Sequence, residues 1–282
     1  MLIELAPHHK YGLPIAAPVM PAAGTFGYGE AYHDLIAVHD LGAIVTNPVS
    51  WRPWRAASGP RIVLHDESFL VHTGHPNPGL RKVVRQHRQG WEHLDVPIIV
   101  HLLATTPPDV AEAAAWLSGS RHVAGIELGL AADVTPEQAA ILLEAAQTEG
   151  DLPVIARVPF GRVGELAPLL AEEGADALTL TAPPRGMLTV DDDGGHRFVR
   201  GRLYGRALFP LLLNELSQWA KKIPAPVIAC GGIATPDEAQ ACLDVGAVAV
   251  QIDALLWRTP EMVNEMLQHL AALPEPDEGL ER

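Results

Sequence analysis

Short apolar runs recur along the chain, and each is followed by a stretch whose apolar residues repeat with helical periodicity. The runs are rich in Val, Ile and Leu and have the length of β-strands. Eight such runs indicate eight successive strand–helix units. The predicted strands are Ile15–Met20, Ala43–Thr46, Pro97–Leu102, Val123–Leu128, Pro153–Val158, Asp176–Thr181, Pro226–Cys230 and Ala247–Ile252.

These runs are unbroken rather than alternating, which is typical of parallel strands that are buried on both faces. A closed sheet of parallel strands with helices outside it satisfies the pattern, and 282 residues is an ordinary length for that fold. We therefore predict an α/β fold, a (βα)8 TIM barrel, with residues 1–282 in a single domain. Its ligand site is expected at the C-terminal ends of the strands.

Signals at the ends of several predicted helices support this alternation. Thr135 and Thr235 each offer an N-cap, followed by a proline and, three positions on, by a capping-box Gln or Glu. Gly174 and Gly246 stand just before predicted strands, where they are expected to end the preceding helices.

Two stretches do not fit the repeat, Ser50–Gly79 and Pro183–Gly205. We predict long loops there, because they follow the second and sixth strands and loops at that end of a barrel usually cover the site. The segment Trp51–Gly79 is expected over the open end, where it brings His72 and His75 toward a ligand. The acidic tail Pro274–Arg282 is expected to be frayed.

The net charge of −14 opposes binding to nucleic acid or to anionic membranes. The chain starts without a basic export segment, and its apolar runs are shorter than a membrane span. Cys230 and Cys242 lie in apolar contexts, so buried thiols are expected rather than a disulfide. Together these features predict a cytoplasmic protein with no nucleic-acid or membrane partner.

A glycine pair follows the seventh predicted strand, in Cys230-Gly231-Gly232-Ile233, and leads into the helix capped by Thr235. Barrels often hold a ligand phosphate at this point, where backbone N–H groups and a helix N-terminus meet. A plain tight turn between strand and helix explains the same glycines, and the residues alone leave both interpretations open.

A segment near the N-terminus is more specific, because residues 18–29 read Pro-Val-Met-Pro-Ala-Ala-Gly-Thr-Phe-Gly-Tyr-Gly. It resembles the first-strand motif of class 1 dihydroorotate dehydrogenases, and the resemblance extends from about Leu13 to Trp257. It implies a flavin oxidoreductase of pyrimidine metabolism that binds FMN and forms a homodimer. Further segments agree in order and spacing: Gly42–Thr46, Asn77–Gly79, Ile126–Leu128, Pro153–Ile155, Gly174–Leu180, Gly186-Met187 and Gly231–Ile233.

The resemblance weakens at the positions that carry the family's chemistry. The family's catalytic base, a cysteine, corresponds here to Ala132, which takes no proton. The asparagines with which the family holds its substrate correspond to Val71, Gly129 and Ala182, which offer no side-chain hydrogen bond. Dihydroorotate is therefore not the expected substrate.

The expected flavin site is also altered. Asn47 and Arg157 stand at two lysine positions of the family. Arg157 is either a cation beside the flavin ring or part of a structural salt bridge. Asp253 replaces a glycine and puts a carboxylate beside the phosphate, so FMN is expected to be weakly held or lost. The full set of flavin positions implied by the resemblance is Ala22, Ala23, Gly24, Asn47, Arg157, Gly205, Gly231, Gly232, Asp253 and Ala254.

Three histidines at or beyond strand ends, His72, His75 and His101, are candidates for contact with a small-molecule substrate. Their spacing is too loose to predict a metal site, and none is expected. Besides a divergent flavin oxidoreductase, two alternatives stay open: a non-catalytic barrel that binds a small ligand or a partner protein, and a flavin-free enzyme that uses histidine.

Overall fold

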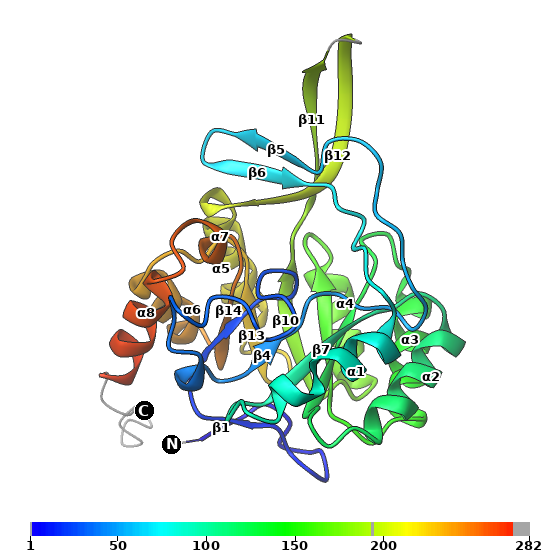
Figure 1. Ribbon diagram of the computed structural model, residues 1–282. Coiled ribbons are helices and arrows are strands. Elements are labelled where there is room, and N and C mark those ends of the chain that lie inside the picture. The colour runs from blue at the N-terminus through cyan, green and yellow to red at the C-terminus, as the bar shows by residue number, and fades with distance from the viewer. Residues whose placement is uncertain (1, 193–194, 273–282) are drawn as a thin grey trace.

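The computed structural model describes residues 2–192 and 195–272. Eight parallel strands form the barrel wall in the order β3-β14-β13-β10-β9-β8-β7-β4. Helices lie around this wall (Figure 1). Gly42 donates its N–H to the Val19 carbonyl at 2.9 Å, which links the two ends of this order. The predicted (βα)8 barrel is confirmed. Its strands are β3 (Val19–Pro21), β4 (Ile44–Val45), β7 (Ile98–Leu103), β8 (Gly125–Gly129), β9 (Val154–Pro159), β10 (Ala177–Ala182), β13 (Val227–Cys230) and β14 (Ala249–Ile252).

The helices cover the outside of this barrel, and their buried faces pack with the outward strand residues into the main hydrophobic core. The capping box at Thr135 is complete, because Gln138 and Thr135 exchange side-chain to backbone hydrogen bonds. At Thr235 only half of it forms, since the Glu238 carboxylate accepts from Ala234 N instead. The helices are α1 (Leu80–Trp91), α2 (Pro107–Ser118), α3 (Pro136–Thr148), α4 (Val163–Glu172), α5 (Phe209–Trp219), α6 (Pro236–Asp244), α7 (Leu255–Arg258) and α8 (Met262–Ala271).

The first strand–helix unit differs from the prediction. Residues Pro14–Ile15 form β2, which pairs antiparallel with β1 (Ile3–Glu4), so only β3 of the predicted run enters the barrel. Between β3 and β4 the structure has one 3-10 turn, Val38–Asp40, and no α-helix. Positive φ angles of 92° at Gly24, 67° at Gly27 and 106° at Gly29 interrupt regular helix there.

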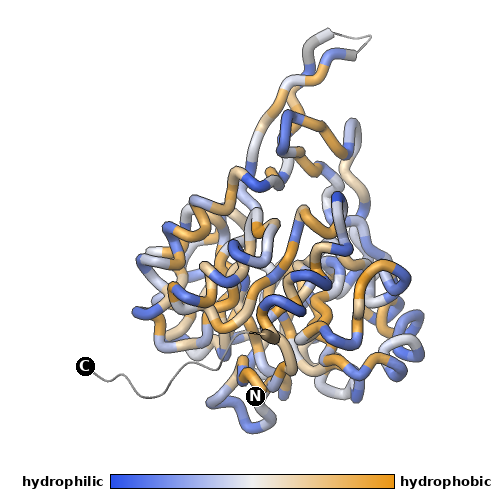
Figure 2. Tube along the Cα trace, turned by 90° about the vertical axis from the view of Figure 1, so that its left-hand side faces the viewer, coloured by the Kyte–Doolittle hydropathy of each residue, from blue (hydrophilic) through white to orange (hydrophobic). Residues whose placement is uncertain are grey.

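The two stretches predicted as loops instead contain all four strands of a separate antiparallel sheet, which corrects that prediction. Its order is β11-β12-β6-β5, and it projects above the open end of the barrel (Figure 1). Hydrophobic positions lie on these strands away from the barrel core (Figure 2), and Leu64 is 80% exposed and Phe198 69% exposed. The strands are β5 (Ile62–His65), β6 (Ser68–Val71), β11 (Arg185–Asp192) and β12 (Gly195–Gly205). We call them the arm sheet.

Side chains inside the barrel form stacked layers, because every second residue of a strand faces the axis. The lower layer is apolar and contains Ile99, Ile155 and Ile228. The next residues facing inward, two positions further along these strands, are His101, Arg157 and Cys230, and all three are buried. The strands are therefore not uniformly apolar, and a polar layer lies directly under the open end.

Cys230 and Cys242 are buried free thiols, as predicted. No helix within the described ranges is long and apolar enough to cross a membrane. The predicted frayed tail, Pro274–Arg282, lies outside the described residues.

Candidate functional site

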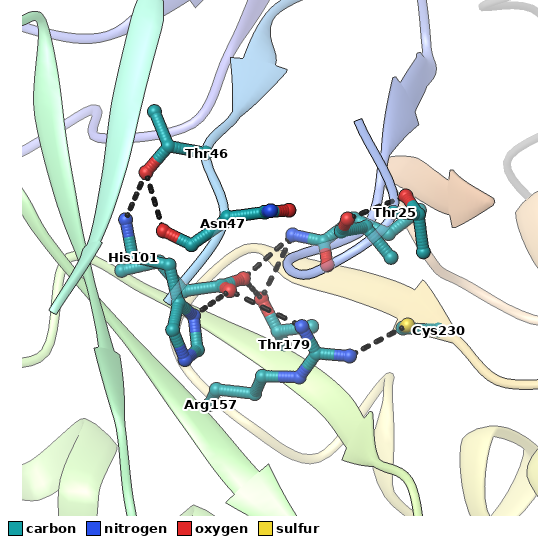
Figure 3. Close-up of polar contacts among 10 residues, drawn as sticks. Thr25, Thr46, Asn47, His101, Arg157, Thr179 and Cys230 are labelled. Atoms are coloured by element: carbon teal, nitrogen blue, oxygen red, sulfur yellow. Dashed lines mark hydrogen bonds and ion pairs between the residues drawn. The ribbon is translucent and has the colours of Figure 1, made fainter. Parts of the chain in front are cut away.

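Glu127 on β8 is the centre of the polar layer, and both its carboxylate oxygens accept hydrogen bonds. Figure 3 shows the surrounding side chains of His101, Arg157, Thr179 and Cys230. Oε1 accepts from His101 Nδ1 at 2.6 Å and from Arg157 Nη1 at 3.3 Å. Oε2 accepts from Thr179 Oγ1 at 2.7 Å and from Gln251 Nε2 at 2.6 Å. The strand register makes these contacts possible, because His101 lies beside Glu127 and Thr179 beside Arg157. The contacts of Glu127 thus connect side chains of five strands, β7, β8, β9, β10 and β14.

The network fixes the charges of its members. Burial by itself raises the pKa of Glu127, but the Arg157 charge and the hydrogen bonds from His101 and Gln251 outweigh it, and the pKa falls to about 2. Burial lowers the pKa of His101 despite its bond to Glu127. His101 is therefore a neutral imidazole that donates from Nδ1 and keeps Nε2 as an acceptor.

Arg157 is held on two sides. Nη1 contacts Glu127 and Nη2 donates to Cys230 Sγ at 3.0 Å, while Nε is buried and has no hydrogen-bond partner among residues 2–192 and 195–272. The contacts of Arg157 thus match the interpretation of this residue as part of a structural salt bridge. Burial raises the pKa of Cys230 to about 12, so that side chain is a thiol and not a competing anion.

Two adjoining cavities lie above the polar layer. The larger has a volume of about 1000 Å³ and separates the barrel mouth from the arm sheet; we call it the cleft. The smaller has a volume of about 30 Å³ and lies directly over His101 and Arg157; we call it the inner cavity. Ala23, Pro48, His75, Arg202 and Tyr204 line both.

Among the charged side chains that line the cleft, positive ones outnumber negative ones, although the chain as a whole carries a net charge of −14. Of the residues that the structure describes, four arginines and two carboxylates, those of Asp66 and Glu67, line the cleft. Aromatic rings form one wall, where Tyr204 stacks on Phe69 at 5.9 Å and meets Trp257 edge-on at 5.0 Å. The arginines are Arg185, Arg200, Arg202 and Arg258. Such a lining suits a small organic anion.

The histidine candidates separate in space. His72 lines the cleft, His101 lines the inner cavity, and His75 lines both. His75 has a φ of 52°, and its carbonyl accepts from Asn77 Nδ2 at 3.1 Å, which holds the loop in this uncommon conformation. Desolvation, reinforced by Arg202, lowers the pKa of His75 to about 3.

This pKa predicts a pH dependence of stability. In the unfolded chain His75 takes up a proton below about pH 6.5, whereas the folded protein keeps it neutral down to about pH 3. Folding stability therefore decreases as the pH falls below about 6.5, by up to roughly 1.4 kcal/mol per pH unit from this residue. Asparagine tolerates the same backbone conformation, so the His75→Asn variant should show a shallower slope between pH 7 and pH 5 in urea unfolding. The exposed His93→Asn change is the control, and an equal slope in wild type and His75→Asn would contradict the prediction.

Asp253 follows β14 and is 1% exposed. Its carboxylate accepts the backbone N–H of Gly232 at 3.4 Å and also that of Ala254. Burial raises the pKa of Asp253, and these amide bonds oppose the rise. Arg258 is directed elsewhere, because its Nη1 donates to the Glu67 carbonyl at 3.3 Å. An internal carboxylate thus holds the amides of the glycine turn.

Comparison with known proteins places the chain in one family. A family model described as dihydroorotate dehydrogenase matches residues 8–154. The catalytic subunit of dihydroorotate dehydrogenase B (NAD(+)) from Geobacter sp. (strain M21) is 30% identical over 279 residues, which cover 92% of this chain and 91% of that protein. The corresponding subunit from Shouchella clausii is 28% identical over 274 residues, 92% of this chain and 90% of that protein. The chain belongs to the dihydroorotate dehydrogenase family.

The family consists of FMN-containing oxidoreductases, but only four of the ten expected flavin residues of this member line the two adjoining cavities. Gly24 and Asn47 line the cleft, Arg157 lines only the inner cavity, and Ala23 lines both. The other predicted flavin positions line neither: Ala22, Gly205, Gly231, Gly232, Asp253 and Ala254. The inner cavity has room for about one water molecule and not for a flavin ring.

The turn after β13, where the phosphate of FMN is expected, does not fit that group either. Asp253 already occupies the amides of Gly232 and Ala254 that a phosphate would need. A Cβ on Gly232 would lie 2.7 Å from Gly205 O and from Phe209 N, so close packing of the chain explains that glycine without a phosphate. The tight-turn interpretation accounts for the geometry, and the residues present do not fit FMN.

The family's substrate and base positions are also altered in space. Val71 faces the cleft, and Gly129 and Ala182 face the inner cavity, so the places of the three asparagines adjoin the cavities without offering side-chain polar groups. Ala132 lies in the turn after β8 and lines neither space. The methyl side chain of Ala132 is not a proton acceptor.

Sequence reasoning missed Glu127, Arg202 and Tyr204 as site residues. A single acid inside an apolar strand, as in Ile126-Glu127-Leu128, was a usable signal, because such a charge requires internal partners. Arg202 and Tyr204 lie on β12, in a stretch expected to be a loop, and no local pattern connects them to the barrel mouth.

Proposed function

We propose that this protein is a divergent, flavin-independent member of the family, which binds a small organic anion in the cleft and does not oxidise dihydroorotate. The observation that carries the proposal is the contact of the Asp253 carboxylate with the amides of Gly232 and Ala254. A carboxylate in that position accepts the backbone hydrogen bonds that the cofactor phosphate would need, and its negative charge repels the phosphate.

The cleft supports the ligand-binding part of the proposal. Its volume of about 1000 Å³ lies at the upper end of the range of small-molecule sites. The excess of arginine over carboxylate favours a negative ligand, and the wall formed by Phe69, Tyr204 and Trp257 favours one with a flat apolar part. The direct test is an absorption spectrum of the purified protein: no flavin band is expected, and a stoichiometric one would refute the flavin-independent function.

Dihydroorotate oxidation should be absent. Loss of a general base costs about 10²–10⁴ in rate, and Ala132 and the apolar groups at Val71, Gly129 and Ala182 remove both proton abstraction and substrate orientation. The assay follows orotate formation with added FMN and with a quinone, fumarate or NAD⁺ as acceptor, with the Geobacter subunit as positive control. Turnover above a blank without enzyme would overturn the prediction.

His101 favours a second candidate, a flavin-free enzyme. Its Nδ1 is fixed on Glu127 at 2.6 Å, which leaves the neutral Nε2 toward the inner cavity as a candidate general base. If the protein turns over a cleft ligand, His101→Gln should abolish turnover while leaving binding of that ligand within threefold of wild type. Retained turnover in the variant would exclude this role.

The expected homodimer and cytoplasmic location belong to the same proposal and rest on the family resemblance and on the sequence. Light scattering of the purified protein tests the dimer. A mass near 30 kDa at all concentrations would exclude it, because one chain has a mass of 30.2 kDa.

A further inference from the structure

The arm sheet carries three arginines on the face that lines the cleft. Side chains two positions apart on a strand share a face, so Arg200 and Arg202 on β12 point to the same side of the sheet. Arg185 on β11 lies directly opposite Arg202 in the strand register. All three residues line the cleft. Their guanidinium groups therefore start from neighbouring positions of one face, and we call them the arginine cluster.

The arginine cluster has no negatively charged partner in the described part of the chain. The side chains of Arg185 and Arg200 make no hydrogen bond or ion pair there. Arg202 Nε donates to His75 Nε2 at 3.2 Å and its Nη1 to the Pro183 carbonyl at 3.4 Å, and both acceptors are neutral. Burial lowers the pKa of Arg202, and the neighbouring arginine charges lower it further. Like charges opposite each other in a sheet are destabilising, and a half-buried cation among them costs free energy that a bound anion recovers.

The two carboxylates of the cleft lie away from the arginine cluster. Asp66 and Glu67 form the turn between β5 and β6, whereas Arg202 pairs with Val71 at the other end of β6. A strand rises about 3.3 Å per residue, so this turn is roughly 10 Å from Arg202 along the sheet. The fourth arginine of the cleft, Arg258, lies beside the turn, because its Nη1 donates to the Glu67 carbonyl.

The carboxylates inside the barrel are also engaged elsewhere. Glu127 and Asp253 both interact electrostatically with Arg157, and neither is among the groups that shift the pKa of Arg202. Asp191, on the same face of β11, is six positions beyond Arg185, which corresponds to about 20 Å along the strand. The positive charge of the arginine cluster is therefore available to a ligand in the cleft.

The number of guanidinium groups indicates which anion fits. Each guanidinium offers a planar fork of N–H donors that matches phosphate or carboxylate oxygens. A carboxylate brings one negative charge and two oxygens, whereas a phosphomonoester brings close to two charges at neutral pH and three acceptor oxygens. Three arginines on one face thus match a phosphoryl group better than a carboxylate.

The same face of the arm sheet also offers an apolar surface for the rest of a ligand. Val71 on β6 and Ile62 on β5 continue the row of Arg202 across the sheet, and Phe69 and Leu64 form the next row. Ile62 is 62% exposed and Leu64 80% exposed, and all four apolar residues line the cleft. A phosphoryl group on the arginine cluster would therefore leave the organic part of its ligand against this apolar surface.

We propose that Arg185, Arg200 and Arg202 form a phosphate subsite on the arm sheet, which holds the phosphoryl group of a small phosphomonoester whose organic part lies in the cleft. The inference rests on the proposed function, because it specifies the organic anion of the cleft as an organic phosphate. The subsite is separate from the glycine turn after β13, where the Asp253 carboxylate already accepts the backbone hydrogen bonds.

Three probes test the subsite: inorganic phosphate, phenyl phosphate, and benzoate, which keeps the ring but carries a carboxylate. Their binding is measured by calorimetry at neutral pH and constant ionic strength, on wild type, Arg185→Gln and Arg200→Gln. Phenyl phosphate should bind at least tenfold more tightly than benzoate, and each variant should weaken both phosphates about tenfold. Arg61→Gln removes an equal charge at an exposed position that lines neither cavity, and it should leave all three affinities within threefold of wild type.

The outcomes separate the subsite from the proposed function. If benzoate binds as tightly as phenyl phosphate, or if neither cluster variant weakens phenyl phosphate, the phosphate subsite is wrong while binding of an organic anion in the cleft stands. An equal loss of affinity in Arg61→Gln would mean unspecific attraction by charge and would also overturn the subsite. If no probe binds wild type, the subsite and the binding of small organic anions in the cleft are both refuted. Arg185 and Arg200 are exposed, so their substitution leaves the core intact, and circular dichroism of both variants checks this.

Discussion

Replacing Glu127 with glutamine should lower the free energy of unfolding by about 3–5 kcal/mol, because it removes one partner of a buried ion pair and leaves the other uncompensated. Arg157 and Glu127 are 4% and 0% exposed, so water does not take over the lost contact. His101 and Thr179 also lose the charged acceptor of their hydrogen bonds. Urea unfolding at pH 7 measures the difference.

The stabilisation by Glu127 should also depend on pH. The folded pKa of Glu127 is about 2, below its ordinary value of 4.5, so its stabilising contribution is complete above about pH 4.5 and is lost as the pH falls toward 2. The difference in the free energy of unfolding between wild type and Glu127→Gln should therefore decrease below about pH 4.5. Glu165→Gln is the matched control, because it breaks a partly exposed ion pair with Arg162 and should cost less than about 1 kcal/mol. A Glu127→Gln effect no larger than this control would show that the network does not stabilise the fold.

Much of the barrel is predictable from sequence, because the features that determine it are local. Strands such as Pro153–Val158 are buried on both faces and appear as apolar runs, and the structure places β9 within one residue of that range. The Thr135 capping box is equally local. The first unit was mispredicted because residues 14–21 form one apolar run that the structure divides between β2 and β3.

The arm sheet could not be predicted from local sequence patterns. Strand β12 pairs with β6, which lies about 130 residues earlier in the chain, and this pairing puts Tyr204 opposite Phe69. That pairing is a long-range contact, and composition rich in Gly, Pro and Arg indicated a loop instead. The cleft lies between this sheet and the barrel. The position of the site at the strand ends could therefore be predicted from the sequence, but the arginines that the arm sheet adds to its lining could not.

The glycine variant of Asp253 should bind FMN at least tenfold more tightly than the wild-type protein. A phosphate dianion about 5 Å from a carboxylate is repelled by roughly 2 to 7 kcal/mol, for an effective dielectric between 80 and 20. Even the lower value exceeds the 1.4 kcal/mol that corresponds to a factor of ten. Asp253→Gly also frees the N–H groups of Gly232 and Ala254, which the carboxylate now occupies. Fluorescence quenching of FMN titrated with each protein measures the affinity.

Two further variants separate charge from hydrogen bonding. Asp253→Asn removes the charge but keeps a side-chain oxygen near Gly232 N, so its gain should be smaller than that of Asp253→Gly. Asp244→Asn removes one negative charge at the end of α6, where the side chain bonds to Gln240, and should leave FMN affinity unchanged. Tight FMN binding by the wild-type protein, with no gain in Asp253→Gly, would mean that Asp253 does not exclude the phosphate. The loss of flavin inferred from this turn would then be wrong, whatever ligand the cleft binds.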